Sequence, residues 1–282
     1  MPSPPGEAAS RFFDADKAAT TANRIGAAAR DIGASFQLAW CWLLLARQDI
    51  RRRYPARSLG PAWITLHSTV MIVSIGLVLS QALGIPYRIF IPYLATGWII
   101  WQFVATNIAE SPSLFLDATL VTMTPHPLFV QVLRQLARNL LVLACNLPVA
   151  TAAFLLLRIH QPVLPFQALA GLVLLVINAA WLCMLIGLLG ARHRDIQQIA
   201  TVAMQPLFFL TPVLWPVRSL GSLGFLADIN PLYFVLESIR SPLLGIALGA
   251  EFWMRYLLIS AGGVAIVFLA FARFRARIPY WL

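Results

Sequence analysis

Long apolar runs constrain the fold of this chain more than any other feature. A helix needs about 20 apolar residues to cross a hydrocarbon core of ~30 Å. The 282-residue chain is 60% hydrophobic and 11% charged, whereas soluble domains carry about 25% charged residues. The pattern predicts an all-α polytopic membrane protein with six transmembrane helices at Pro61–Leu83, Ile91–Ala109, Leu136–Leu157, Leu164–Gly190, Ile199–Val217 and Trp253–Phe271.

Positive charges gather on one side of the predicted spans. Sixteen of the 21 Lys and Arg residues lie in the N-terminal segment, in the connections after the second and fourth spans, and at the C-terminus. Cytoplasmic segments carry the excess of Lys and Arg, so both termini are predicted to be cytoplasmic. The net charge of +10 is spread between apolar runs. It therefore favours contact with anionic membrane lipid and argues against nucleic acid binding.

The segment before the first span divides into two parts. Residues 1–34 are expected to form an N-terminal cytoplasmic tail. Residues 35–57 are expected to form an amphipathic interface helix, because an apolar face around Trp40 precedes the basic cluster Arg51–Arg53. A helix packed against the bundle is the alternative. The six-span transmembrane domain then covers residues 58–282.

An unusual connection, at about residues 220–249, separates spans five and six. It is mostly apolar although it is predicted to be external. Asn230-Pro231 is typical of a helix start, Pro242 is typical of a helix end, and Glu237 and Arg240 are spaced to pair. An external re-entrant helical hairpin is predicted, since irregular backbone in a membrane must contact protein or water. An ordinary amphipathic loop is the alternative.

The connection Ser111–Gln135 is the long cytoplasmic one. Its prolines leave Ser113–Met123 as a short helix candidate. Such a helix would dock a cytoplasmic partner, gate a pore or simply connect two spans, and the sequence does not separate these roles.

Polar side chains share faces of the predicted spans. The first span carries the set His67, Met71, Ser74, Val78 and Gln81, and the third carries Asn139, Leu143, Asn146, Ala150 and Ala153. Asn178 stands alone in the fourth span. Polar groups in hydrocarbon are costly, so these faces are expected to point at the bundle interior or at water. Interhelical hydrogen bonding and the lining of a pathway both fit the pattern.

The stretch Arg192–Pro216 joins four charged or imidazole side chains to an apolar run. Thr211-Pro212 lies near its far end, so a cytoplasmic turn followed by a broken transmembrane helix is predicted. Aromatic side chains flank this break and also fill the second span. Aromatic residues at span ends are usually interfacial anchors, which fits Trp215. Such rings also stack on sugars, so the sequence does not decide between an anchoring and a sugar-binding role for Trp101, Phe208 and Phe209.

The sequence contains no recognisable nucleotide-binding, catalytic or metal-binding motif. Lys17 is the only lysine and has no glycine-rich loop before it. A phosphate-cradling GxxxxGK[ST] motif is therefore excluded, and any ATP must be hydrolysed by another polypeptide. No Ser/His/Asp set, metal-ligand spacing or pair of acids within a span is present. We expect a chain that is not itself an enzyme, with no cofactor and no metal.

Several short motifs follow one another in a fixed order. They are Gln48-Asp49-Ile50-Arg51 with Tyr54, Ser58-Leu59-Gly60-Pro61-Ala62-Trp63, Gly97-Trp98 with Trp101 and Phe103, the block Arg192–Trp215, and Asn230-Pro231 with Arg240-Ser241-Pro242-Leu243-Leu244-Gly245. Together they resemble the permease subunits of bacterial ABC exporters for O-antigen, capsule and teichoic acid chains. The C-terminal Arg275-Ala276-Arg277-Ile278-Pro279-Tyr280-Trp281 resembles a branch that includes mycobacterial galactan exporters.

The resemblance implies a homodimer in the bacterial inner membrane, with two copies of a separate nucleotide-binding ATPase subunit that binds ATP and Mg. It implies export of a lipid-linked polysaccharide, carried on polyprenyl pyrophosphate, as in lipopolysaccharide biosynthesis. The implied substrate pathway comprises Trp98, Trp101, Phe103, Phe208, Phe209, Trp215 and Tyr233. The implied ATPase contact or gate comprises Gln48, Arg51, Arg52, Arg53, Leu116, Asp117, Arg192, Arg194 and Asp195.

One departure concerns the long cytoplasmic connection. Many family members carry lysines near the position of Thr122, so a phosphate-holding role of this connection is not expected here. Two other functions remain alternatives. A membrane-bound lipid-linked sugar transferase lacks support because no DxD-like motif is present. A secondary transporter usually needs carboxylates in mid-membrane, and the predicted spans contain no Asp.

Overall fold

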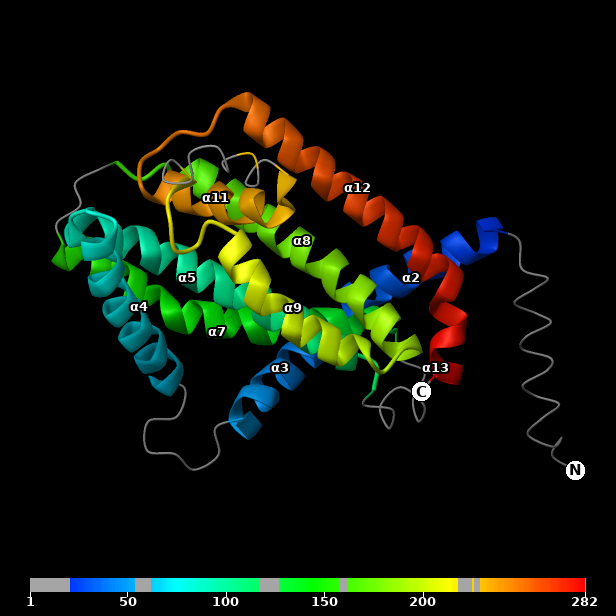
Figure 1. Ribbon diagram of the computed structural model, residues 1–282. Helices are drawn as coiled ribbons and strands as arrows, with labels where there is room; N and C mark the ends of the chain where they lie inside the picture. Colours follow the sequence, from blue (N-terminus) through cyan, green and yellow to red (C-terminus); the bar gives the residue numbers. More distant parts are fainter. Residues whose placement is uncertain are drawn as a thin grey trace, which may run out of the picture.

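The computed structural model describes residues 21–53, 62–116, 127–157, 162–217, 225 and 229–281 (Figure 1). All regular elements in these ranges are helices. In chain order they are α2 (Thr21–Gln37), α3 (Ala39–Arg53), α4 (Ala62–Ala82), α5 (Tyr87–Glu110), η1 (Ser111–Ser113), α7 (Phe129–Leu156), α8 (Pro165–Arg192), α9 (Ile196–Leu210), α11 (Pro231–Leu243), α12 (Ala250–Phe274), η3 (Arg275–Arg277) and α13 (Ile278–Trp281). The predicted all-α fold is confirmed for the described residues.

Five helical segments are long and apolar enough to cross a membrane. They are Ala62–Ala82, Tyr87–Ser113, Phe129–Leu156, Pro165–Arg192 and Ala250–Trp281, and each contains or closely matches a predicted span. The remaining predicted span, Ile199–Val217, is occupied mainly by α9, which has 15 residues, and by the turns and bends of residues 211–216. A 15-residue helix measures only about 22 Å. Six crossings therefore stay a prediction.

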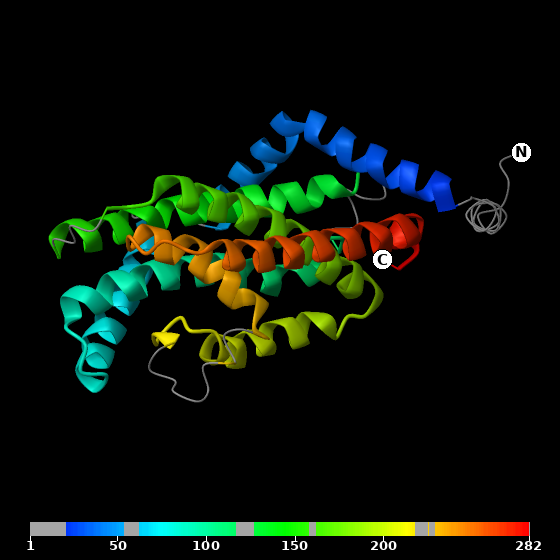
Figure 2. The same cartoon turned by 90° about the horizontal axis from the view of Figure 1, so that it is seen from above.

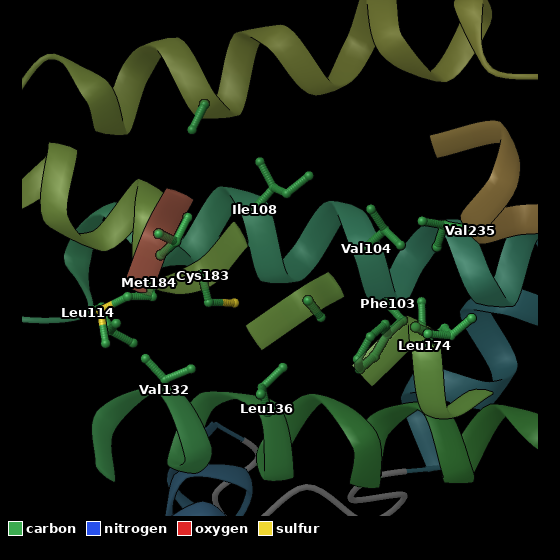
Figure 3. Close-up of a cluster of buried hydrophobic side chains, with 14 of the residues drawn as sticks. Phe103, Val104, Ile108, Leu114, Val132, Leu136, Leu174, Cys183, Met184 and Val235 are labelled. Carbon is green, nitrogen blue, oxygen red and sulfur yellow. The ribbon is translucent and has the colours of Figure 1, made fainter. Parts of the chain in front are cut away.

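Helix α5 lies at the centre of the bundle. It contacts α4, α7, α8, α9 and α11, and most of its side chains are buried. Figure 3 shows the core that results, with Phe103 and Val104 of α5 close to Leu136 of α7 and Leu174 of α8. This apolar core fixes the relative positions of the spans on which the candidate sites lie.

Helix α4 packs less tightly than α5. It approaches α5 closely at Gly76, where an added Cβ would lie 2.9 Å from Cγ1 of Ile91. The polar stripe predicted on this span is exposed along its whole length in the single chain, from His67 to Gln81. On α7, by contrast, Asn139 and Asn146 are buried. The two polar stripes therefore have different surroundings, one open and one inside the bundle.

Helices α2 and α3 precede the bundle and meet at a break around Leu38. A helix therefore begins at Thr21, well inside the segment that was expected to be a tail. Figure 2 shows α2 and α3 on one face of the bundle and α9 on the opposite face. The predicted interface helix corresponds to α3, on which Trp40 is 69% exposed. Its placement at a membrane surface remains a prediction.

Buried Asp31 joins α2 to the start of α7 and to η3. Its carboxylate accepts hydrogen bonds from the backbone N–H groups of Leu128, at 3.2 Å, and Phe129, at 3.0 Å. It also pairs with Nε of Arg275 at 2.7 Å. A carboxylate at the start of a helix is favourable because it satisfies free N–H groups and opposes the helix dipole. Asp31 thus ties the N-terminal helix to α7 and η3.

The predicted external hairpin is described only in its second half. The helix α11 begins where Asn230-Pro231 predicts it, and the Asn230 side chain accepts from the N–H of Leu232 at 2.9 Å. The helix ends at Leu243, directly after Pro242. It packs on α8, where an added Cβ at Gly171 would overlap the carbonyl of Ser238. The two-helix, re-entrant form lies partly outside the described residues and stays a prediction.

Candidate functional site

An aromatic cluster forms where α5 meets the C-terminal half of α9. The Phe208 ring lies 5.8 Å from Trp98, edge-on, and 5.5 Å from Trp101. Phe209 lies 5.4 Å from Phe208. These distances are typical of favourable aromatic pairs. Four residues of the predicted pathway, from two distant spans, are therefore neighbours in the fold.

Exposure differs sharply within this aromatic cluster. Trp98 and Trp101 are 8% and 7% exposed, so their rings mainly support Phe208. Phe209 is 57% exposed, and its neighbour Phe208 is half-buried. The open aromatic face of the cluster is therefore on α9, and the tryptophans of α5 form its base.

The other predicted pathway residues make different contacts. Phe103 is buried in the core and also borders a cavity between α4, α5 and α7. Trp215 is half-buried, and its carbonyl accepts from the hydroxyl of Tyr93 at 2.9 Å. Its side chain packs on the same small apolar cluster as Phe208. Tyr233 packs with Phe252, at 6.4 Å, between α11 and α12.

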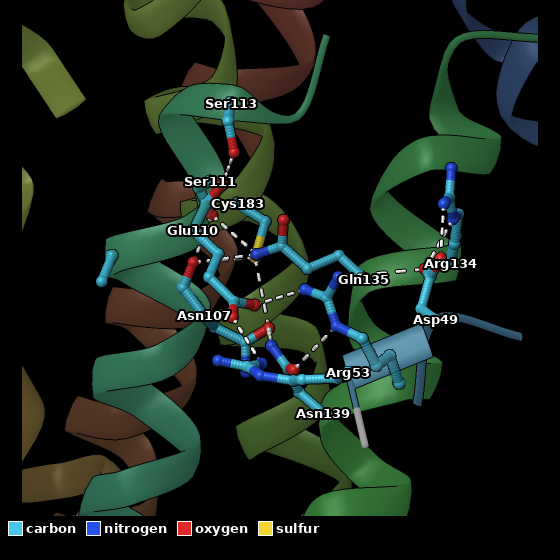
Figure 4. A network of polar contacts seen from close by, with 12 residues as sticks. Asp49, Arg53, Asn107, Glu110, Ser111, Ser113, Arg134, Gln135, Asn139 and Cys183 are labelled. Carbon is cyan, nitrogen blue, oxygen red and sulfur yellow. Dashed lines mark hydrogen bonds and ion pairs between the residues drawn. The ribbon is translucent and has the colours of Figure 1, made fainter. Parts of the chain in front are cut away.

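A charged network joins α3, α5 and α7 (Figure 4). Arg134 binds Asp49 through two parallel bonds of 2.7 and 2.6 Å. Arg138 lies 3.9 Å from Asp49 and also pairs with Glu110. Arg53 binds Glu110 at 2.9 Å. Because such bidentate guanidinium–carboxylate pairs fix geometry, this network sets how α3 sits against the bundle.

Neutral polar groups extend this network into the bundle. The Gln135 amide donates to the carbonyl of Asn107 at 2.9 Å and to the hydroxyl of Ser111 at 3.1 Å. The Asn139 amide donates to the side-chain oxygen of Asn107 at 3.0 Å. All four side chains are buried. Buried polar groups need such partners, so part of the predicted stripe on α7 serves interhelical hydrogen bonding.

The predicted ATPase-contact residues form two exposed groups. On α3 the exposed members are Gln48, Arg51, Arg52 and Arg53, and around the α8–α9 turn they are Arg192, Arg194 and Asp195. Leu116 is 43% exposed, whereas Asp117, Thr122 and most of the predicted helix Ser113–Met123 lie outside the described residues.

The C-terminal end of α5 contacts both α3 and the start of α9. Arg53 pairs with Glu110, as described above, and the Gln197 amide of α9 donates to the carbonyl of Ala109 at 3.0 Å. Gln197 lies in the first turn of α9, directly after the second exposed group.

A second buried ion pair lies in α11. Arg240 is 0% exposed and pairs with Glu237, as the spacing predicts. Its Nη1 donates to the carbonyl of Pro212 at 2.7 Å, and its guanidinium lies over the ring of Tyr93. Gly97 leaves room for this guanidinium, since an added Cβ would lie 3.2 Å from Nη1. Arg240 therefore links α11 to α5 and to the end of α9.

Sequence reasoning missed the acidic members of these networks. Asp31, Asp49 and Glu110 each bind an arginine, yet none was predicted as a site residue. These acids could have been singled out because acidic residues are rare in this chain, which has only 11 of them. An acid next to an apolar run in such a chain indicates a buried or half-buried pair.

Comparison with known proteins supports the membrane-transport reading. Residues 41–244 match the family model described as ABC-2 type transporter. The match spans well over half of the chain, from α3 to the end of α11. A search of curated proteins found no match. From the apolar spans, the arrangement of the helices and this match, the chain is a multi-pass membrane protein that belongs to the ABC-2 type transporter membrane-domain family.

Proposed function

We propose that this chain is the permease subunit of an ATP-driven exporter of lipid-linked polysaccharide. Its family makes it the membrane-spanning subunit of an ABC transporter, which pairs with an ATPase subunit. The proposal adds the substrate, a glycan such as O-antigen or galactan on polyprenyl pyrophosphate, and the bacterial inner membrane with both termini cytoplasmic. It also adds a homodimer that binds two ATPase subunits.

The observation that carries the substrate proposal is the aromatic cluster. Phe209 is exposed on α9 and contacts the half-buried Phe208, which packs against Trp98 and Trp101. Aromatic rings stack on the C–H faces of sugars without forming tight, direction-specific bonds. Such contacts suit a polymer that must slide, because each step exchanges one stacked ring for another.

The homodimer proposal is supported by the exposed polar face of α4. His67, Ser74 and Gln81 are all exposed in the single chain. Polar side chains of a membrane helix face protein or water because lipid cannot bond them. A second copy, or a water-filled path between two copies, would satisfy this face.

The proposed coupling route begins at the exposed groups on α3 and the α8–α9 turn. An ATPase subunit seated on Arg51, Arg52 and Arg192 would contact both groups at once. Closure of the ATPase would then act on the end of α5, because Glu110 binds Arg53 and Ala109 binds Gln197, which follows the α8–α9 turn. Most of α5 is buried against its neighbours, so it would carry this movement to the aromatic cluster.

Photo-crosslinking tests the substrate proposal. A photoreactive phenylalanine analogue at position 209, in cells that make the polysaccharide, is expected to capture a glycan-bearing lipid. The same analogue at position 36, an exposed phenylalanine on α2, is the matched control and is expected to capture none. Two results would contradict the proposal: equal capture of the glycan-bearing lipid at both positions, or capture of phospholipid without glycan at position 209.

A further inference from the structure

A cavity of about 250 Å³ with polar and apolar walls lies between α4, α5 and α7. Its polar side chains include Arg53, His67, Gln102, Thr106, Asn139 and Asn146. We propose that this cavity binds the phosphate-linked polyol headgroup of a membrane lipid. The phosphate would lie at Arg53 and the hydroxyl groups at the amides of α7. This inference concerns a site apart from the aromatic cluster and does not depend on the polymer proposed above.

The divergence of α4 from α5 creates the cavity. The two helices touch closely at Gly76 and Ile91, near the turn that joins them, and they separate toward the start of α4 (Figure 1). Across the gap, the hydroxyl of Thr65 donates to the carbonyl of Cys145 on α7 at 2.8 Å. Trp63, at the α4 edge of the cavity, is 50% exposed. The cavity is thus reached from the side of the bundle that α4 covers.

An unpaired acceptor marks the inner part of the cavity. Asn146 is 2% exposed, and its amide nitrogen donates to the carbonyl of Val142 at 3.3 Å. Its side-chain oxygen has no hydrogen-bond partner in the described part of the chain. A buried amide oxygen without a donor is unfavourable. The oxygen itself has almost no accessible surface, so a rotation of the Asn146 side chain, which lines the cavity, would bring it to a ligand hydroxyl that supplies the donor.

The charged side chain that lines the cavity is Arg53, which favours an anion. Arg53 belongs to the network of Figure 4, whose three arginines, at 53, 134 and 138, outnumber its two acids, Asp49 and Glu110. In the part of the chain that the structure describes, Arg53 binds Glu110 through Nη1, which leaves Nε and Nη2 for a phosphate. Guanidinium groups bind phosphate through such paired donors.

The size and walls of the cavity point to a headgroup. The cavity is partly open, and its volume of about 250 Å³ has room for a small polyol. Ile64, Ile99, Val142 and Leu143 supply an apolar wall that a fully hydrated solute would not need. Two lipids offer this chemistry. One is a phospholipid with a phosphoglycerol head, and the other is a polyprenyl carrier with a phosphate-linked sugar.

The test uses the full-length chain purified in detergent, with native mass spectrometry to count bound lipid. The probes are phosphatidylglycerol, phosphatidylcholine with the same acyl chains, and a polyprenyl pyrophosphate-linked monosaccharide. At least one of the two polyol lipids is expected to bind tenfold or more tightly than phosphatidylcholine. The tighter of the two identifies the source. Equal binding of all three would overturn the proposal.

Matched variants assign the binding to this cavity. Arg53→Gln and Asn146→Leu are each expected to lower the affinity for the selectively bound lipid at least tenfold. Arg47→Gln, an exposed arginine of the same helix that does not line the cavity, is expected to change it less than twofold. Arg53 is half-exposed on α3, so its replacement should leave the fold intact, which a thermal unfolding curve checks.

Two results would overturn this assignment. Equal losses of affinity in Arg47→Gln and Arg53→Gln would indicate that diffuse surface charge binds the lipid. Unchanged lipid selectivity in Asn146→Leu would show that the Asn146 amide does not contribute to the site. Soluble competitors test the polyol requirement. Glycerol phosphate should displace the lipid at a tenfold lower concentration than inorganic phosphate does. Equal displacement would show an anion site that does not recognise a polyol.

Discussion

The guanidinium carbon of Arg240 lies 4.0 Å from the centre of the Tyr93 ring. This contact joins α11 to α5, because Arg240 has no exposed surface and also binds Glu237 and the carbonyl of Pro212. A buried guanidinium is stable only when carboxylates, carbonyls and rings replace the water that it has lost. The contact is therefore expected to hold α11, α5 and the end of α9 together.

Replacement of Arg240 tests that role. Arg240→Met leaves the Glu237 carboxylate buried without its partner, which is expected to cost about 3–5 kcal/mol of stability. The double variant Arg240→Met with Glu237→Gln removes the lone charge and is expected to recover part of this loss. Thermal unfolding in detergent checks both. If Arg240→Met alone is as stable as the original chain, the stabilising role of Arg240 is contradicted.

The contact of α8 with α11 gives a second prediction. An alanine at Gly171 would overlap the carbonyl of Ser238, so Gly171→Ala is expected to destabilise the chain by about 1–3 kcal/mol. Gly262 on α12 has open space around its Cβ position, so Gly262→Ala should be neutral or slightly stabilising. Equal unfolding temperatures for the two variants would show that the close approach of α11 is not essential.

The pairing of Asp49 with Arg134 gives a third. Asp49→Asn keeps the shape of the side chain but weakens two charge-assisted bonds, and a loss of about 1.5–3 kcal/mol is expected. Cysteines placed on α3 and α7 and labelled with spin probes should show a broader distance distribution in this variant. An unchanged distribution would indicate that apolar contacts alone position α3.

Helix content follows from the sequence in this chain because its signals are local. Apolar runs predicted α4, α5, α7, α8 and α12, and the Asn230-Pro231 pair predicted the start of α11. The ion pair of Glu237 with Arg240 followed from i,i+3 spacing on one helix. In each case the deciding residues lie within one or a few turns of each other.

Contacts between distant segments did not follow from the sequence. Asp49 and Arg134 are 85 residues apart, and no local pattern at either residue predicts that the two pair. The helix α2 was missed because its Ala-rich stretch lacks an apolar run, although alanine favours helix strongly. The aromatic residues of α5 and α9 were expected on one path, but only the packing shows that tryptophans support Phe208 while Phe209 is open.

That difference in exposure gives a fourth prediction. Phe209→Ala removes an open ring and is expected to reduce export of the polysaccharide at least tenfold while the amount of assembled protein stays the same. Trp101→Ala removes a buried ring, so a loss of about 3–5 kcal/mol of stability is expected as well. Surface polysaccharide and protein level in the membrane are measured together. Normal export by the Phe209 variant would contradict the aromatic path.

The central claim is that this subunit moves a lipid-linked glycan only when a separate ATPase supplies the energy. The direct test is uptake of radiolabelled lipid-linked polysaccharide into inside-out vesicles that contain the chain, with and without its ATPase subunit. The account predicts uptake that requires both proteins and ATP, and that stops when the ATPase cannot hydrolyse ATP. Uptake or sugar transfer by the chain alone, or none with the active ATPase present, would contradict it.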